Sequence, residues 1–408
     1  MTPSSLPPPR PAGGSELDRR GLLGGLAALG GLGLTGCVSP VAVAQPPLVT
    51  GRGDPGLYLA PLRASIRRIF EISVCTRPFR AAGPRLDAET IGDALVVHNY
   101  GHGGSGWSLS WGSSAIAVQK ALAGSPREIA VIGSGPLGLT SALLAQSAGT
   151  QVTIYARELV PEMPSLRATG SFTPDSRIAL TDAVDPAFPA LWEQMARASY
   201  HRYNELLGLP GDPVQWVDRY TVSDPGPRPP RPRVEGELDF ASYEAHLGDL
   251  LPRGEAMEPG STPFHGFSVR RGANLMFNLA SYANMLVGQF RQAGGRIERR
   301  EFHAPGELAQ LPQKVVINCT GYGARALLGD ESVVPVRGQI AWLIPQREFD
   351  YALAFRGVNV VPRTDGIGVQ AVSGGDMRGY GDDSAVPDRA EAEEAVATLA
   401  ELYARFGR

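Results

Sequence analysis

A glycine-rich segment between Gly133 and Gly138, with the sequence GSGPLG, has the spacing of a loop that binds phosphate groups. It follows a short apolar run, 129–132 (IAVI), and precedes a segment rich in Ala and Leu, so a strand should enter the loop and a helix should leave it. Gly133 permits the tight turn, Gly135 lets the backbone approach a pyrophosphate, and Gly138 lets the helix pack on the strand. The helix N-terminus then presents unpaired N–H groups to the phosphates. The pattern predicts a dinucleotide site.

A carboxylate after the next strand fits the same site. A second apolar run, 151–155 (QVTIY), leads into Arg157 and Glu158, which completes a βαβ unit. Glu158 lies 20 residues after Gly138, where a carboxylate can accept hydrogen bonds from the ribose hydroxyl groups of adenosine. This unit alone does not distinguish FAD from NAD.

The distinction rests on a second glycine-dense turn, 98–108 (HNYGHGGSGWS), which follows the apolar run 94–97. It closely resembles the HNYGHGG signature of the D-amino-acid oxidase family. Two further segments resemble that family: 316–321 (VINCTG) its second flavin-contact strand, and 337–340 (RGQI) the strand that enters its substrate lobe. The resemblance covers most of residues 57–408 and implies FAD as the cofactor.

The resemblance also implies which residues contact FAD. Glycines in the signature let the backbone pass against the isoalloxazine ring, with N–H groups directed at its carbonyl edge. Residues 151–174 match the family's adenosine and flavin contacts. On this basis the FAD contacts are Gly133, Gly135, Gly138, Arg157, Glu158, Ser165, Gly170, Ser171, Phe302, Thr320, Gly103, Gly104, Ser105, Gly106, Trp107 and Ser108.

The implied reaction is oxidative deamination of an amino acid. In this family a hydride passes from the substrate Cα to flavin N5, the imino acid hydrolyses to a 2-oxo acid and ammonia, and oxygen reoxidises the flavin to give hydrogen peroxide. An Arg-Pro-x-Arg segment some twenty residues before the signature supplies the clamp for the α-carboxylate. Arg77, in 77–80 (RPFR), takes this role here, because a guanidinium offers a carboxylate two parallel donors. By the same resemblance, the Gly104 carbonyl accepts a hydrogen bond from the substrate amine.

Four other reactive side chains are expected to have structural roles. His98 and His102 should hydrogen-bond the loop backbone rather than transfer protons. Cys75 and Cys319 lie in apolar, strand-like runs and should be buried thiols rather than nucleophiles.

The order of the segments departs from the family. Its Arg-Pro-x-Arg segment and its HNYGHGG signature close the chain, whereas here both precede the dinucleotide-binding strand. The block 57–122 therefore resembles the family's C-terminal piece moved to the front, which is a circular permutation. Because domain termini often lie close together, this hypothesis predicts that Arg408 ends near residues 57–61 in space.

The substrate pocket is a second departure. The family places two tyrosines four residues apart before a strand that ends in Pro; the matching positions here are Phe355 and Asn359, before 360–362 (VVP). Both hydroxyl groups are lost, although Asn359 could donate to the carboxylate instead. The substrate is then a D-amino acid or a glycine-like amine. Two alternatives stay open: a membrane-anchored dehydrogenase with an acceptor other than oxygen, and an FAD-binding lipoprotein with weakened catalysis.

The first 37 residues have the features of an export signal. Arg19 and Arg20 precede a Gly-rich apolar run of 16 residues, 21–36, which is shorter than a membrane-spanning helix. The pair resembles a twin-arginine signal, and 34–37 (LTGC) resembles a lipobox in which Cys37 is lipidated. We therefore expect a periplasmic or cell-surface lipoprotein of a bacterium, with residues 38–55 as a tether.

The elements that must position these residues alternate between strand and helix, which predicts an α/β fold with a Rossmann-type FAD-binding domain and a second, β-rich substrate domain. Helices are expected at 57–70, 107–122, 186–207, 275–293 and 387–406. The expected FAD-binding domain comprises 56–180 (56–125 being the displaced block), 266–335 and the C-terminal helix in 387–408. The expected substrate domain comprises 181–265 and 336–386.

Composition narrows the partners. The net charge of −3 argues against a broad nucleic-acid surface, and three cysteines cannot form a disulfide framework. No metal site is expected. The expected partners are a small amino acid or amine, molecular oxygen or another electron acceptor, and a membrane reached through Cys37; a homodimer is compatible with the sequence.

Overall fold

The computed structural model of the protein describes residues 58–227 and 236–407. The expected export signal with Arg19 and Arg20, the lipidation site Cys37 and the tether 38–55 lie outside these residues. Within the described part of the chain, no helix has the length and apolar character needed to cross a membrane.

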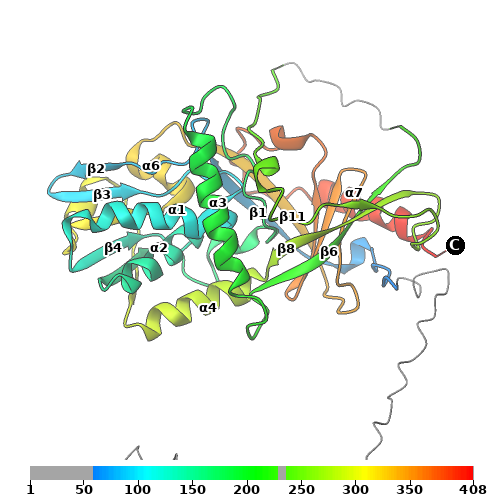
Figure 1. Ribbon diagram of the computed structural model, residues 1–408, viewed down its shortest axis with the longest axis horizontal. Helices are drawn as coiled ribbons and strands as arrows, with labels where there is room; N and C mark the ends of the chain where they lie inside the picture. The colour runs from blue at the N-terminus through cyan, green and yellow to red at the C-terminus, as the bar shows by residue number, and fades with distance from the viewer. Residues whose placement is uncertain (1–57, 228–235, 408) are drawn as a thin grey trace, which may run out of the picture. The chain divides into compact units, whose positions relative to one another are not determined.

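A six-stranded sheet in the order β2-β3-β10-β4-β5-β9 contains the predicted βαβ unit (Figure 1). All neighbouring strands are parallel except the β2–β3 pair. The strands are β2 (Ala88–Ile91), β3 (Ala94–His98), β4 (Glu128–Ile132), β5 (Gln151–Ala156), β9 (Arg296–Arg299) and β10 (Val315–Asn318).

Helices cover both faces of this sheet, because its side chains alternate between two cores. In β4, Ile129 and Val131 join one core, whereas Ala130 and Ile132 join the other. The first core is closed by α1 (Gly106–Ala121), α2 (Pro136–Ser147), α3 (Phe188–Asn204) and α4 (Leu279–Gln292), and the second by α5 (Gly306–Ala309) and α6 (Ala324–Leu328). The expected Rossmann-type arrangement is confirmed.

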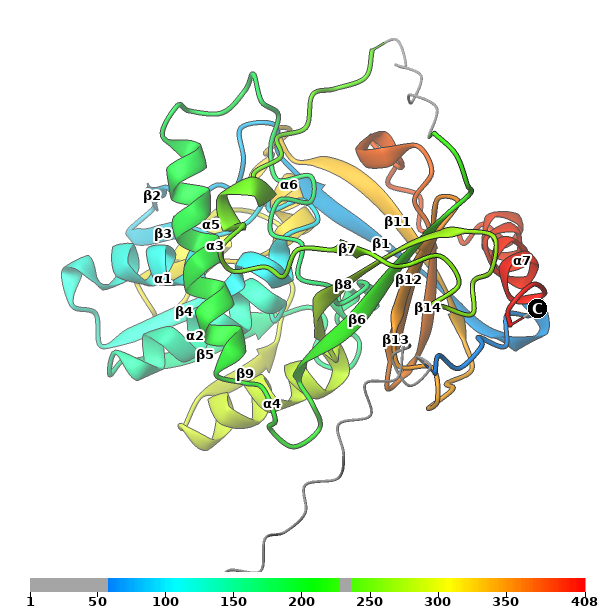
Figure 2. The ribbon, with the colours of Figure 1, turned by 45° about the vertical axis from the view of Figure 1, so that its right-hand side comes forward.

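The second sheet has eight strands in the order β1-β11-β14-β13-β12-β6-β8-β7, and all neighbours are antiparallel except β12 and β6. One of its faces packs on α7 (Arg389–Tyr403), as Figures 1 and 2 both show. Its strands are β1 (Ile69–Phe79), β6 (Val214–Ser223), β7 (Glu255–Ala256), β8 (Ser268–Phe277), β11 (Val334–Leu343), β12 (Ala352–Phe355), β13 (Val358–Arg363) and β14 (Gly366–Ala371).

The helix expected at 57–70 is wrong. Only a short 3-10 turn, Ile66–Arg68, precedes the 11-residue strand β1. Of the expected helix, only Ile69 and Phe70 lie in β1, a strand rich in β-branched and aromatic side chains that pairs with β11 from Ile69 to Phe79. A distant partner strand, which a local pattern cannot reveal, decides the conformation here.

Several expected domain boundaries also need correction. β1 and β8 belong to the eight-stranded sheet, although both were expected in the FAD-binding domain. Conversely, α3 packs on α1 beside the six-stranded sheet. The C-terminal helix α7 buries Val396 and Leu399 against the eight-stranded sheet, so it belongs to the β-rich part and not to the FAD-binding part.

The two ends of the described chain lie side by side, close to the letter C in Figures 1 and 2. The hydroxyl group of Tyr351 donates to the Ala60 carbonyl at 2.8 Å and is hydrogen-bonded to the hydroxyl group of Tyr403 at 2.9 Å. Leu59 and Leu402 share one core. The described residues nearest to the two ends therefore have the proximity that a circular permutation requires.

Candidate functional site

The site lies where parallel strands of the six-stranded sheet end together. His98, Asn318, Ile132 and Tyr155 are aligned across β3, β10, β4 and β5, so the loops after these strands meet at one edge of the sheet. A cavity of about 1560 Å³ runs from this edge to the eight-stranded sheet. Its volume exceeds the roughly 300–1,000 Å³ of one small-molecule pocket, so it has room for a dinucleotide and a substrate.

Glycines shape the wall at the end of β4. Gly133 has a φ of +107°, and a Cβ there would lie 2.5 Å from the Cys319 carbonyl oxygen. A Cβ on Gly138 would lie 1.9 Å from the Gly133 carbonyl oxygen, so only glycine lets α2 begin this close to the strand. The first turns of α1 and α2 both line the cavity, and neither helix has a side-chain cap. Their free N–H groups suit an anion such as a pyrophosphate.

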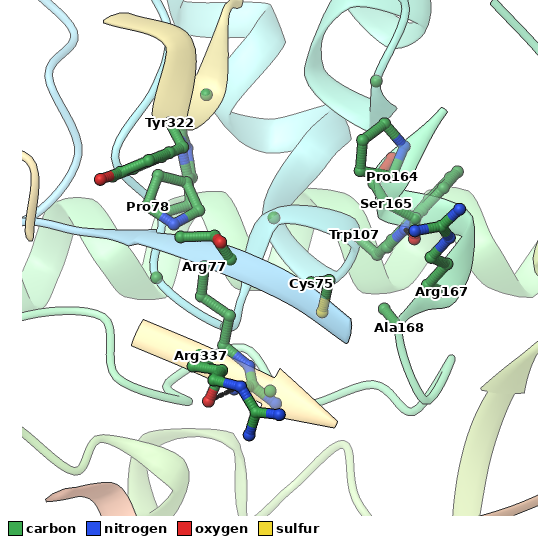
Figure 3. Close-up of a pocket in the computed structure, with 18 of the residues that line it drawn as sticks. Cys75, Arg77, Pro78, Trp107, Pro164, Ser165, Arg167, Ala168, Tyr322 and Arg337 are labelled. Carbon is green, nitrogen blue, oxygen red and sulfur yellow. Dashed lines mark hydrogen bonds between the residues drawn. The ribbon is translucent and has the colours of Figure 1, made fainter. Parts of the chain in front are cut away.

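Unsatisfied polar atoms in the wall fit a bound cofactor. Ser165 Oγ and His102 Nδ1 are buried, line the cavity, and have no hydrogen-bond partner among the described residues. Figure 3 shows Ser165 beside Trp107, whose indole N–H donates to the Ser165 carbonyl at 2.9 Å. A polar ligand that reaches this wall would satisfy both atoms.

A charged cluster marks the adenosine end. Glu158 follows β5 and pairs with Arg157 at 2.6 Å; Arg157 also reaches Glu301 at 3.1 Å, and these ion pairs raise the pKa of its guanidinium. Phe302 lines the same end and packs edge-on against Tyr155. The carboxylate of Glu158 therefore lines the cavity at the end of β5, and its binding of ribose hydroxyl groups stays a prediction.

Most residues expected to contact FAD line this cavity, but four do not. Gly138 lies behind the wall as a packing position. Ser105 donates to the Ser176 carbonyl and Ser108 accepts from the Thr173 N–H, so both hold loops together. Gly170, with a φ of +80°, lets its turn approach Phe277. The residues that line the cavity are Gly133, Gly135, Arg157, Glu158, Ser165, Ser171, Phe302, Thr320, Gly103, Gly104, Gly106 and Trp107.

Both histidines of the signature have structural partners, but these are side chains rather than the expected loop backbone. His98 Nε2 lies 2.8 Å from a Glu89 carboxylate oxygen, and its Nδ1 lies 3.2 Å from the Asn318 amide nitrogen. His102 Nε2 lies 2.7 Å from Ser113 Oγ. Complete burial lowers the pKa of His102 to about 3, which keeps this imidazole neutral at physiological pH.

The cysteines differ from each other. Cys319 is buried, and desolvation raises the pKa of its thiol to about 12, as expected of a structural cysteine. Cys75 is only half-buried and lines the cavity two residues before Arg77, so the expectation of a buried thiol is wrong there. Within the described ranges, no three His, Cys, Asp or Glu side chains gather closely enough to hold a metal ion.

Arg77 extends from β1 across β11 into the substrate end of the cavity (Figure 3). Its only hydrogen bond to the described residues goes to the Arg337 carbonyl at 3.2 Å, and no carboxylate among them pairs with it. The guanidinium packs on Gly338, where a Cβ would lie 2.5 Å from Nη1 and Nη2. Arg177 is a second cation nearby. Its pKa is lowered to about 10, mainly by burial and to a smaller extent by the positive charge of Arg77.

The two predicted pocket positions on the β12–β13 hairpin lie on opposite faces of the sheet. Asn359 lines the cavity, and its side chain makes no hydrogen bond to the described residues. Phe355 is 2% exposed and packs edge-on against Phe267 in the core beneath α7, so its predicted role in the site is wrong. Arg356 and Gly357, both with positive φ, form a two-residue turn between the strands. Phe355 therefore stays in the regular alternation of β12, in which successive side chains point to opposite faces of the sheet.

Sequence reasoning missed Arg219, which lies on the cavity face of β6. The strand reads VQWVDRYTVS, and its alternation places Tyr220 and Val222 in the core beneath α7. Arg219 must therefore point to the opposite face. That alternation was visible in the sequence, but the presence of a cavity on this face was not.

Comparison with known proteins gives the chain's relatives. The sequence model of the FAD dependent oxidoreductase family (DAO) matches residues 128–408. A D-amino-acid oxidase of Streptomyces coelicolor is 28% identical over 214 residues, which cover 52% of this chain and 58% of that protein. A D-amino-acid oxidase of Dictyostelium discoideum is 26% identical over 68% of this chain and 73% of its own length. An L-amino acid deaminase of Proteus vulgaris superposes with a TM-score of 0.43 at 15% identity, over 69% of this chain and 75% of that one.

Proposed function

Because the chain belongs to the family of FAD-dependent oxidoreductases, with FAD as its cofactor, we propose that it catalyses the oxidative deamination of an amino acid. The substrate loses a hydride from Cα and a proton from its amine, the imino acid hydrolyses to a 2-oxo acid and ammonia, and oxygen takes up the two electrons as hydrogen peroxide. The observation that carries this proposal is the guanidinium of Arg77, which lies in the cavity without a carboxylate partner among the described residues.

Arg77 binds and orients the α-carboxylate. Its fork supplies two parallel donors, and its packing on Gly338 fixes the plane of the fork. Asn359 donates a further hydrogen bond from the facing strand. When bound, FAD supplies the acceptor for the hydride, so the chain itself contributes mainly orientation rather than a general base.

The neutral state of His102 agrees with this division of roles. His102 is buried with a pKa of about 3 and cannot accept a proton from the substrate amine near neutral pH. Instead, the Gly104 carbonyl, which lies on the cavity wall, accepts a hydrogen bond from the amine. The amine then loses its proton to water.

Anaerobic flavin bleaching tests the proposal. The FAD-loaded chain is mixed with a panel of D- and L-amino acids without oxygen, and air is then admitted. Bleaching followed by peroxide formation supports an oxidase, and bleaching with slow reoxidation by air supports a dehydrogenase with another acceptor. If no amino acid bleaches the flavin, the proposed reaction is wrong and the chain is an FAD-binding protein without this activity.

A substitution of the clamp sharpens the test. We expect Arg77→Ala to lower kcat/KM at least about 1,000-fold while FAD remains bound. The substitution removes a charged, hydrogen-bonded pair between the guanidinium and the substrate carboxylate, and this pair does not involve the cofactor. Arg389→Met is the control, since Arg389 is exposed and its one ion-pair partner among the described residues is Glu393 on α7. Activity that survives in Arg77→Ala would overturn the role of this residue.

We also propose that the chain is a circular permutation of its family. Two observations support it: the family model begins to match only at residue 128, after the block that carries Arg77 and the glycine signature, and the described ends lie side by side at Tyr351. The twin-arginine signal and lipidated Cys37 remain proposals from the sequence, with a periplasmic or cell-surface location. Mass spectrometry of the mature N-terminus tests them.

A further inference from the structure

Arg219 is a charged side chain in the cavity for which the fold supplies no partner. It makes no hydrogen bond or ion pair with any residue that the structure describes. Burial lowers the pKa of its guanidinium, and a distant attraction to Glu244 offsets this only in part. Arg219 is half-buried, so its guanidinium is partly desolvated without a counter-charge, and a bound anion would stabilise it.

The neighbours of Arg219 form a small, apolar floor. On one side it is paired with Ala352 in β12, and on the other with Gly272 in β8. Ala352 packs with Val361 of β13. These short side chains leave the space around the guanidinium open to the cavity, so the site is not filled by the protein itself.

Arg219 shares the cavity with the residues that we assign to the α-carboxylate. Asn359 lies on β13, two strands from β6 and two residues along from the position level with Arg219, which corresponds to about 12 Å within the sheet. The phosphate-binding loop belongs to the opposite wall, at the edge of the six-stranded sheet. An anion bound to Arg219 therefore lies on the substrate side of the cavity and is not a phosphate group of the cofactor.

We propose that Arg219 binds the side-chain carboxylate of an acidic amino acid whose α-carboxylate is held by Arg77. The proposal rests on the proposed function for the position of the α-carboxylate. It makes dicarboxylic amino acids, of the size of aspartate or glutamate, the preferred substrates.

Binding of non-oxidisable ligands tests Arg219 without turnover. Succinate and glutarate carry two carboxylates but no amine, and propionate and butyrate carry one carboxylate. In the FAD-loaded chain, titration followed by the flavin spectrum should show that the dicarboxylates bind at least about 30-fold more tightly. Arg219→Met should remove this preference, Arg219→Lys should keep part of it, and the exposed control Arg389→Met should leave it unchanged. Equal affinity for both ligand classes in the unaltered protein would overturn the proposal.

Turnover then separates this inference from the proposed function. We expect glutamate or aspartate of the accepted configuration to exceed the matching glutamine or asparagine at least about 100-fold in kcat/KM. Arg219→Met should lose this factor mainly through KM, with neutral substrates changed less than about threefold. If neutral amino acids are oxidised equally well, the acidic preference is wrong and the oxidase function stands. If dicarboxylates bind through Arg219 and no amine bleaches the flavin, the function is wrong and the anion site stands.

Discussion

The two walls of the cavity are built by different means. At the edge of the six-stranded sheet the backbone forms the surface: glycines at 103, 104, 106, 133 and 135 bring N–H groups and two helix N-termini to the ligand. At the eight-stranded sheet the side chains form the surface: Arg77, Asn359 and Arg219 project from separate strands.

This difference explains what each wall can recognise. The wall formed by backbone binds phosphate groups and the flavin ring through main-chain N–H groups, which any sequence carries. It therefore depends on glycines that let the backbone approach the ligand, more than on any particular side chain. The wall formed by side chains takes its chemistry from a few residues at alternate positions of its strands. Its substrate preference should therefore change when one of these residues is substituted. The cofactor wall should therefore be intolerant of added atoms, and the substrate wall should respond to single side chains.

The largest effect is expected from a methyl group added to the cofactor wall. Gly138→Ala places a Cβ where the Gly133 carbonyl oxygen lies 1.9 Å away, so α2 must move from the strand. We expect loss of bound FAD and a fall in unfolding free energy of about 3 kcal/mol. Flavin absorbance per protein and chemical unfolding measure both. Gly124→Ala is the control, because no atom lies within 4 Å of its added Cβ; full FAD occupancy in Gly138→Ala would contradict the comparison.

A methyl group on the substrate wall should act differently. Gly338→Ala places a Cβ 2.5 Å from the Arg77 guanidinium and displaces the fork. Because a shift of about 1 Å in a positioning group costs about 100-fold, we expect kcat/KM to fall by that factor with FAD occupancy unchanged. Steady-state kinetics and flavin absorbance on the same preparation decide the matter. Loss of FAD in this variant would show that the two walls are not independent.

A smaller effect should distinguish the two faces of the β12–β13 hairpin. Asn359→Ala removes a donor from the cavity and should raise KM about tenfold, the value of one hydrogen bond to a charged group. Phe355→Leu alters the opposite face and should leave KM unchanged while lowering stability by about 1 kcal/mol. A change in KM for Phe355→Leu would return that residue to the site.

The last effect, small near neutral pH, concerns the acid stability of the cofactor wall. His102 has a folded-state pKa of about 3, below its unfolded value near 6.5, so between these pH values only the unfolded chain binds the proton. Stability should be full above about pH 6.5 and fall as the pH decreases, with a slope of up to about 1.4 kcal/mol per pH unit. His102→Gln should flatten this slope in unfolding experiments at pH 4 to 7. Equal slopes in both proteins would mean that His102 is not held neutral.

The same difference between the two walls determines which parts of the fold and the site could be predicted from the sequence. The glycine loops and Glu158 were predictable because a contiguous motif contains all the information about a strand–turn–helix unit. Arg77 was found by its distance from the signature. For Arg219 and Phe355 the alternation along each strand is visible in the sequence, but which face borders the cavity depends on strand register and on what packs behind the sheet, and no local pattern contains that. For the same reason the helix expected at 57–70 wrongly included Ile69 and Phe70, the first residues of β1, and α7 was assigned to the wrong sheet.

The pairing of β1 with β11 has a consequence for biosynthesis. Arg77 and its hydrogen-bond partner Arg337 are separated by 260 residues, so β1 leaves the ribosome long before its only neighbour in the sheet exists. At 5–20 residues per second, this delay is about 13–50 s. During that time an apolar strand with unsatisfied backbone groups is open to chaperones or to other chains, and the substrate clamp is completed only when translation is nearly finished.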